Sequence, residues 1–255
     1  MRLPTRMREA TMDHDVTSAV RRRRPLVIAA AQPACVPYDV AANAATHSTV
    51  VRAASARVVV FPELSLTGYE LDAPALDADD PRLGPIVRAC AATGSVALVG
   101  APVAGAGDLV HIGMLVIDGG GATVAYRKIW LGGDEPARFS PGDDPAVLVV
   151  DGWRLGLAVC KDTGVPQHAA DTAALGMDAY LAGMLESAED AAIVDRRAGR
   201  IAADHRVWVA IASFAGSTGG GYTRAAGGSG IWAPDGVAVA RAGPTVGEIA
   251  LATLT

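Results

Sequence analysis

Residues 57–63 read RVVVFPE, and on both sides of this run short apolar segments alternate with longer polar ones. Three valines and a phenylalanine in succession are typical of a buried strand. Pro62 ends the strand, because proline has no N–H to donate to a neighbouring strand. Glu63 then places a carboxylate directly after buried apolar residues, which is unusual for a solvated surface. The run therefore predicts a buried strand that is followed directly by Glu63, a candidate functional carboxylate.

Strands and helices alternate outward from this run. A strand at 26–32 and a helix at 40–56 precede it, which predicts a strand–helix–strand unit. Glycines 119–121 and the Asp151-Gly152 dipeptide mark hairpins, since both accept the positive φ of tight turns. We expect further helices at 81–92, 166–175 and 188–205, strands at 96–103, 110–118, 123–128, 146–150, 153–159, 179–182, 207–213, 231–233, 237–240 and 248–254, and glycine-rich loops at 216–221 and 227–230. The pattern predicts an α/β fold with mixed sheets.

Composition narrows the classes of function. The 255 residues carry a formal net charge of −5, so we expect no nucleic-acid partner. No apolar stretch reaches membrane-spanning length without a charge or turn signal, so we expect no membrane partner. Three scattered cysteines without a CxxC pair argue against a disulfide framework and a thiolate zinc site, and without a secretory leader they favour a cytoplasmic protein. We expect residues 1–24 to form a disordered tail and residues 25–255 to form one domain.

Three reactive side chains lie at the ends of predicted strands. These are Glu63, Lys128 and Cys160, and the carboxyl ends of strands are where sites assemble in α/β proteins. A thiol at a turn into a helix can act as a nucleophile, an ammonium can stabilise an oxyanion, and a carboxylate can take and return a proton. The residues alone leave other interpretations open: Cys160 as a buried apolar residue, Lys128 as a surface lysine and Glu63 as a capping group.

Three motifs in this order resemble those of the nitrilase (carbon–nitrogen hydrolase) superfamily. They are FPELSLTGY at 61–69, YRKIWL at 126–131 and LAVCKD at 157–162. IAAAQ at 28–32 and GSGIWAPDG at 228–236 support the resemblance, which therefore covers residues 25–255. It implies a four-layer αββα sandwich with two mixed β-sheets, and a site that needs no cofactor and no metal ion.

The resemblance also implies roles for individual residues. Glu63 falls on the position of the general base, Lys128 on that of the oxyanion stabiliser, and Cys160 on that of the nucleophile that forms an acyl-thioester. A second, structural glutamate is common in the family shortly before a Pro-Gly turn. Glu135 is the best match for it, and we expect it to hold Lys128 and to orient the substrate.

The surroundings of these residues depart from the family pattern. Trp130 stands where many members have histidine, and it is expected to form an apolar wall of the pocket together with Tyr69 and Leu185. After the cysteine, many members have Tyr-Asp and a downstream Arg-Phe-Pro-Glu. This chain has KDTGVPQH at 161–168, which keeps Asp162 and Pro166 but lacks the Arg and the Glu. The backbone N–H of Lys161 remains available to an oxyanion. Because recognition groups often lie in this loop, the change leaves the substrate class open.

Three functions fit these observations. The first is hydrolysis of a small amide, an ω-amide or a carbamoyl amine. The second is a true nitrilase, with the same three residues and a linear C≡N substrate. The third is a catalytically silent protein that works through binding or assembly. A pair of Cys160 with His168 is conceivable, but nothing in the sequence favours it. The resemblance further implies a homodimer, or a higher homo-oligomer, formed through helices on one outer face.

Overall fold

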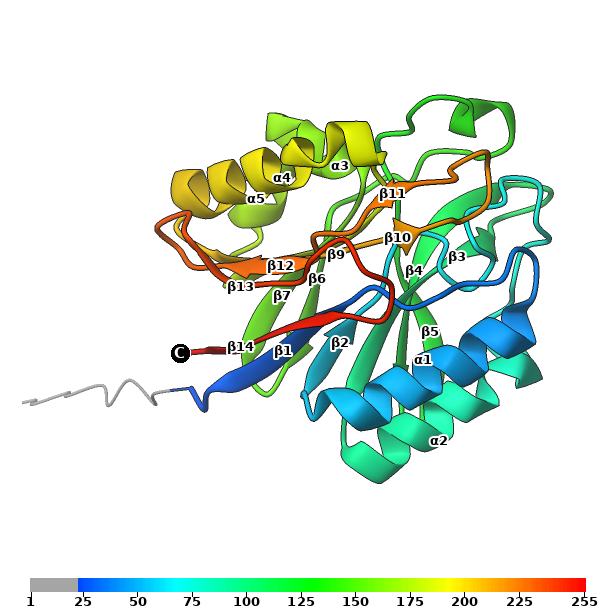
Figure 1. Cartoon of the computed structure of the whole chain (residues 1–255), viewed down its shortest axis with the longest axis horizontal. Helices are drawn as coiled ribbons and strands as arrows, with labels where there is room; N and C mark the ends of the chain where they lie inside the picture. Colours follow the sequence, from blue (N-terminus) through cyan, green and yellow to red (C-terminus); the bar gives the residue numbers. More distant parts are fainter. Residues whose placement is uncertain (1–22) are drawn as a thin grey trace, which may run out of the picture.

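The computed structural model describes residues 23–255, and these form two six-stranded sheets packed face to face between layers of helices (Figure 1). The first sheet has the order β14 (Ile249–Leu254), β1 (Leu26–Ala31), β2 (Val58–Val60), β3 (Val96–Ala104), β4 (Val110–Asp118) and β5 (Gly121–Arg127). The second has the order β13 (Ala238–Arg241), β12 (Gly230–Trp232), β9 (Trp208–Ser213), β8 (Ala179–Met184), β7 (Trp153–Val159) and β6 (Ala146–Val150). The predicted four-layer αββα sandwich is confirmed.

Both sheets are mixed, as expected. β1, β2 and β3 are parallel, as are β7, β8 and β9, while the remaining strands of each sheet pair in antiparallel fashion. Parallel neighbours need a crossover, and helices supply it. α1 (Val40–Ala54) and α2 (Gly84–Thr93) cover the first sheet, and α4 (Pro166–Ala174) and α5 (Ala192–His205) cover the second (Figure 1).

The run at 57–63 shows how the layers are held together. Val58 and Val60 face the core between the two sheets, while Val59 and Phe61 face the core beneath α1 and α2. Because side chains alternate across a strand, a strand in an inner layer needs apolar residues at every position. That requirement explains the unbroken apolar run, and it brings Glu63 to the junction of both sheets.

Several elements differ from expectation in their ends. The helix predicted at 81–92 begins as a 3₁₀ turn, Pro81–Leu83, and continues as α2. A short helix, α3 (Lys161–Gly164), follows Cys160, and a two-stranded ribbon of β10 (Ala215–Gly216) and β11 (Ala225–Ala226) flanks the glycine-rich loop. Further 3₁₀ turns occupy Glu135–Ala137 and Ala188–Asp190.

The predicted tail of residues 1–24 falls largely outside the described residues, which begin at 23. Arg23 pairs with Asp178, and the Arg24 carbonyl accepts a hydrogen bond of 2.8 Å from the Trp153 indole N–H. These two residues are therefore attached to the second sheet. Within the described part of the chain, no helix combines the length and apolar character needed to cross a membrane.

Candidate active site

Two strands, one from each sheet, press on the backbone around Glu63. A Cβ atom added at Gly183 of β8 would lie 2.6 Å from the Phe61 carbonyl oxygen, and one added at Gly100 of β3 would lie 2.5 Å from the Pro62 carbonyl oxygen. Neither position has room for a side chain, so glycine is required for the two sheets to clamp this segment. Glu63 is consequently fixed in a buried position, with 1% of its surface exposed.

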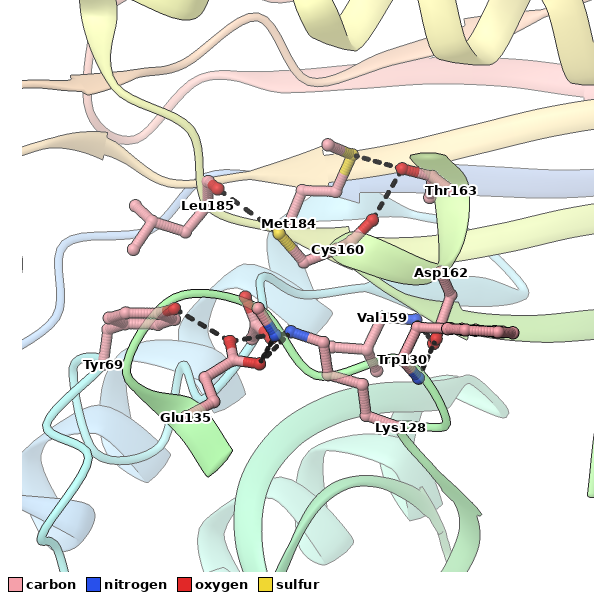
Figure 2. A network of polar contacts seen from close by, with 12 residues as sticks. Tyr69, Lys128, Trp130, Glu135, Val159, Cys160, Asp162, Thr163, Met184 and Leu185 are labelled. Atoms are coloured by element: carbon pink, nitrogen blue, oxygen red, sulfur yellow. Dashed lines mark hydrogen bonds and ion pairs between the residues drawn. The ribbon is translucent and has the colours of Figure 1, made fainter. Parts of the chain in front are cut away.

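Lys128 lies between two carboxylates. Its Nζ atom lies 2.7 Å from Glu63 Oε1 and 2.7 and 2.8 Å from the two oxygens of Glu135. Glu135 is held in turn by the Tyr69 hydroxyl, which donates to Oε1 at 3.0 Å, and by the Gly132 N–H, which donates to Oε2 at 2.8 Å. Figure 2 shows the Lys128 ammonium pointing toward this carboxylate. The expected contact of Glu135 with Lys128 is present, and the ammonium is fixed from two sides.

Cys160 occupies a strained turn at the end of β7. Its backbone has φ 41° and ψ −95°, a conformation that side-chain-bearing residues rarely adopt. Its N–H donates to the Gly183 carbonyl at 2.9 Å, and its Sγ lies 3.4 Å from the Leu185 carbonyl oxygen (Figure 2). Such strain persists only where the surrounding structure enforces it, and it is common at functional sites.

The three groups alter one another's protonation. Burial raises the pKa of Glu63 to about 7, although the Lys128 ammonium opposes that shift. Burial lowers the pKa of Lys128, but the neighbouring Glu63, Cys160 and Glu135 outweigh it and raise that pKa overall. Burial and then the Glu63 charge raise the pKa of the Cys160 thiol well above its ordinary value. Cys160 therefore rests as a thiol at neutral pH, beside a carboxyl group that can hold or release a proton there.

Glu63 keeps one oxygen free. Oε1 contacts Lys128, whereas Oε2 is buried and has no hydrogen-bond partner within residues 23–255. A buried acceptor without a partner is rare and is often explained by a catalytic role or by a missing ligand. This oxygen is available to a proton from a thiol, a substrate nitrogen or a water.

A buried network centred on Asp162 joins the lysine segment to the cysteine turn. Asp162 accepts N–H groups from Val159 and Trp130, both at 2.9 Å, and the Tyr126 hydroxyl at 2.8 Å. His168 lies 2.8 Å from the hydroxyl of Tyr126 through one ring nitrogen and 2.8 Å from that of Tyr180 through the other. Both nitrogens of His168 are thus used, so the conceivable pair with Cys160 does not form. The sequence offered no signal for this network beyond the position of Asp162.

A cavity of about 480 Å³ is bordered by Lys128, Glu135 and Cys160, whereas Glu63 lies behind Lys128 and is not part of its lining. Its lining comprises Tyr69, Leu71, Lys128, Gly132, Gly133, Asp134, Glu135, Cys160, Lys161, Leu185, Glu186, Arg197, Gly220, Gly221 and Tyr222. The loop at 216–221 therefore reaches the cavity. Sequence reasoning did not single out Glu186, Arg197 or Tyr222, because each comes from a different part of the chain.

Trp130 does not form the predicted wall. Its side chain is 44% exposed, it is absent from the lining of the cavity, and its ring points away from the Lys128 ammonium in Figure 2. Its backbone N–H donates to Asp162 at 2.9 Å, so the backbone of this residue is anchored at the site while its ring is exposed. Tyr69, Lys161 and Leu185 do line the cavity. Within residues 23–255, no group of three or more His, Cys, Asp or Glu side chains is arranged to hold a metal ion.

Comparison with known proteins identifies the family. The sequence profile of the family described as carbon–nitrogen hydrolase matches residues 27–255. The chain belongs to the carbon–nitrogen hydrolase family. This carbon–nitrogen hydrolase is 32% identical over 216 residues to a Pseudomonas protegens protein described as "Hydrolase in pqqF 5′region", with 81% of this chain and 75% of that protein covered. It is 28% identical over 128 residues to an (R)-stereoselective amidase from Pseudomonas sp., covering 49% of this chain and 46% of that protein.

Solved structures share the fold of this carbon–nitrogen hydrolase. A variant of the amidase from Nesterenkonia AN1, of the nitrilase superfamily, superposes with a TM-score of 0.81 at 22% identity, covering 90% of each chain. Saccharomyces cerevisiae Nit3, a member of branch 10 of that superfamily, gives 0.80 at 22% identity, covering 91% of this chain and 90% of its own. These two structures therefore share the fold of this chain, and an amidase is among its structural neighbours.

Proposed function

We propose that this protein hydrolyses the amide bond of small molecules through an acyl-thioester on Cys160. One observation carries the proposal. The buried Lys128 ammonium lies 2.7 Å from Glu63 and from Glu135, and it borders the same cavity as the Cys160 thiol. Acyl transfer requires a nucleophile and a fixed cation at one small cavity, with an acid–base group close by, and here that group is in contact with the cation.

The first half of the reaction forms the thioester. The Cys160 thiol gives its proton to Glu63 while the sulfur attacks the carbonyl carbon, and the carbonyl oxygen becomes an oxyanion. The Lys128 ammonium faces that oxyanion, and the Lys161 backbone N–H is a second donor. The C–N bond then breaks, and the departing nitrogen takes the proton from Glu63 and leaves as ammonia or an amine. The raised pKa of the thiol supports the need for this base.

The second half returns the enzyme to its starting state. Water gives a proton to Glu63 and its oxygen attacks the thioester carbon, with the new oxyanion again facing Lys128. The C–S bond breaks, the sulfur recovers the proton from Glu63, and the carboxylic acid leaves. A pKa of about 7 suits Glu63 to both directions of proton transfer at neutral pH. Glu135 contributes by holding the ammonium in place.

The test is ammonia release from a panel of small amides, with the matching nitriles in parallel. We expect turnover of amides, loss of turnover in Cys160→Ala, and a thioester mass on the peptide that contains Cys160 after rapid acid quenching. Cys35→Ala is the matched control, because Cys35 is also partly buried but does not line the cavity. Turnover that survives in Cys160→Ala, preference for nitriles over amides, or no turnover of either panel would overturn the proposal.

A further inference from the structure

Thr163 is a fully buried residue of α3 whose hydroxyl faces the cysteine turn. Its Oγ1 lies 2.6 Å from the Cys160 carbonyl oxygen, and Figure 2 shows this contact beside the thiol. Thr163 does not line the cavity, so it is not placed to touch a substrate. We propose that Thr163 is a positioning residue, whose hydroxyl holds Cys160 in the strained conformation that places the sulfur for attack. This inference rests on the proposed function, because it concerns the nucleophile of that reaction.

The backbone of Cys160 needs support on both sides. Its φ of 41° and ψ of −95° are a combination that residues with side chains rarely adopt, and it persists only where neighbours enforce it. The Cys160 N–H is fixed by the Gly183 carbonyl at 2.9 Å. The Cys160 carbonyl accepts from the Thr163 N–H at 3.0 Å and from the Thr163 hydroxyl at 2.6 Å. Because the direction of this carbonyl defines ψ of Cys160, Thr163 fixes that angle, and its hydroxyl adds a bond that an apolar residue cannot make.

The surroundings of the Thr163 hydroxyl direct its single proton to the Cys160 carbonyl. Arg197 Nη1 lies 3.5 Å from Oγ1, and a guanidinium can only donate. Although this contact is long, the positive charge faces the lone pairs of the hydroxyl oxygen and favours the proton on the far side. The Met184 sulfur, at 3.8 Å, is the competing acceptor, but a thioether accepts weakly. The hydroxyl therefore donates to the carbonyl.

Contacts with α5 hold Thr163 itself in place. Arg200 donates to the Thr163 backbone carbonyl at 2.8 Å. Arg197 Nη1 lies 2.8 Å from Glu186 Oε1, so these two charges neutralise each other. The Arg197 guanidinium also fills the space beside Gly164, where an added Cβ atom would lie 3.2 Å from it. α3 is thus braced by two arginines of one helix, and the hydroxyl keeps its direction toward the cysteine turn.

The Cys160 sulfur must meet groups that belong to the other sheet. Glu63 and Lys128 follow strands of the first sheet, so a small rotation of the cysteine turn changes both separations at once. A misplacement of about 1 Å can lower a rate roughly 100-fold. Because Thr163 does not line the cavity, loss of its hydroxyl should alter the placement of the sulfur rather than the binding of an amide.

The test compares Thr163→Val, which keeps the size of the side chain but lacks the hydroxyl, with Thr163→Ser, which keeps the hydroxyl. We expect Thr163→Val to lower kcat and kcat/KM for small amides together by at least tenfold, with KM unchanged. Thr163→Ser should recover most of this loss. Alkylation of Cys160 by iodoacetamide at pH 7, measured on the peptide that contains it, should slow in the same order, since the reaction needs the sulfur close to its base.

Thr172→Val is the matched control. Thr172 is also fully buried, and its hydroxyl donates to a backbone carbonyl, that of His168, at 2.7 Å within α4. It does not line the cavity. The variant therefore removes the same kind of hydrogen bond at another place. Its urea midpoint should fall about as much as that of Thr163→Val, while its kcat and its alkylation rate should equal those of the unmodified protein.

The outcomes separate this inference from the proposed function. A kcat and an alkylation rate in Thr163→Val that match the unmodified protein, a loss that Thr163→Ser does not recover, or a loss that Thr172→Val shares would overturn the inference, while amide hydrolysis would stand. If the unmodified protein hydrolyses no amide, the proposed function fails. Slower alkylation in Thr163→Val alone would then still support the role of Thr163 in placing the sulfur.

Discussion

Lys128 is the residue on which the candidate site depends, because it is fully buried and balances two carboxylates. A buried ammonium is costly to desolvate, and its attraction to Glu63 and Glu135 offsets that cost only while all three remain in contact. Stability and chemistry are therefore linked at this position. From the sequence alone, loss of the lysine would be expected to affect only the oxyanion, in a protein that stays folded.

Lys128→Met should damage both activity and stability. We expect kcat to fall roughly 100- to 1,000-fold through loss of an oxyanion donor, and the free energy of unfolding to fall by about 3–5 kcal/mol because two buried carboxylates lose their partner. Urea unfolding should show a smaller loss at pH 5 than at pH 8, since protonation removes the stranded charge. Arg127→Met is the neighbouring control. An unchanged urea midpoint at pH 8 would contradict the argument.

Glu63 should give the protein opposite pH trends in activity and stability. Its pKa is raised from 4.5 to about 7, mainly by burial, so the ionised base accumulates and kcat/KM should rise as pH increases through about 7. Between those two values the folded state holds the proton more tightly than the unfolded state does. The Glu63 contribution to the free energy of unfolding therefore falls as pH rises across this interval.

The measurement for this prediction compares the unmodified protein with Glu63→Gln. Urea midpoints at pH 5 and pH 7.5 should fall more in the unmodified protein than in the variant, which lacks the titrating group. A kcat/KM profile without a limb near pH 7, or equal pH slopes of stability in both proteins, would show that Glu63 does not titrate as argued.

At the scale of elements, the clamp formed by β3 and β8 positions the acid, and the Asp162 network positions the nucleophile. Gly100 and Gly183 leave no room beside the backbone of residues 61–64. Asp162 ties the N–H of Val159, just before the cysteine, to the N–H of Trp130, two residues after the lysine. The segment that carries the acid is thus held by two other strands, and the segment that follows the lysine is held by the turn that carries the cysteine.

Gly183→Ala should disturb the site through the backbone. The added methyl group would overlap the Phe61 carbonyl, so we expect a loss of about 1–3 kcal/mol in unfolding free energy and a lower kcat as Glu63 shifts. Gly84→Ala is the matched control, because there the added atom meets only the flexible end of Arg88. If Gly183→Ala and Gly84→Ala have the same thermal midpoint and the same kcat, the argument that Gly183 fixes the Glu63 backbone is wrong.

At the scale of the whole molecule, the candidate site exists only where the two sheets meet. Glu63 and Lys128 follow strands of the first sheet, whereas Cys160 follows a strand of the second. The apolar core between the sheets therefore fixes the relation between the acid and cation on one side and the sulfur on the other. Separation of the two sheets would therefore part the sulfur from the acid and the cation.

We expect the protein to form a homodimer through its outer helices, with α4 and α5 as the contact face. Light scattering at micromolar concentration should give twice the chain mass. Ala170→Arg, at an exposed position of α4, should shift the mass toward that of one chain, while Thr49→Arg on α1, in the opposite outer layer, should not. A single-chain mass for the unmodified protein would disprove the expectation.

Much of the fold could be predicted because short stretches of sequence specify individual strands, helices and turns. Strand 58–60 and its neighbours appear as apolar runs, the hairpin at Asp151-Gly152 as a turn signal, and α1 as a stretch without glycine or proline. These preferences act between residues that are close in sequence. The pairing of strands, by contrast, joins residues that are far apart in the sequence. The run at 249–254 does not by itself indicate that β14 pairs with β1 rather than with a strand of the second sheet.

The sequence by itself determined the alternation of elements and the three reactive side chains at strand ends. Only the tertiary structure decided which groups surround them: the contact of Lys128 with two carboxylates, the outward turn of Trp130, and the arrival of Arg197 over the cysteine turn. Local preferences follow from each residue's own backbone and side chain. Contacts between distant segments follow from how two whole sheets pack, which depends on many weak apolar contacts acting together.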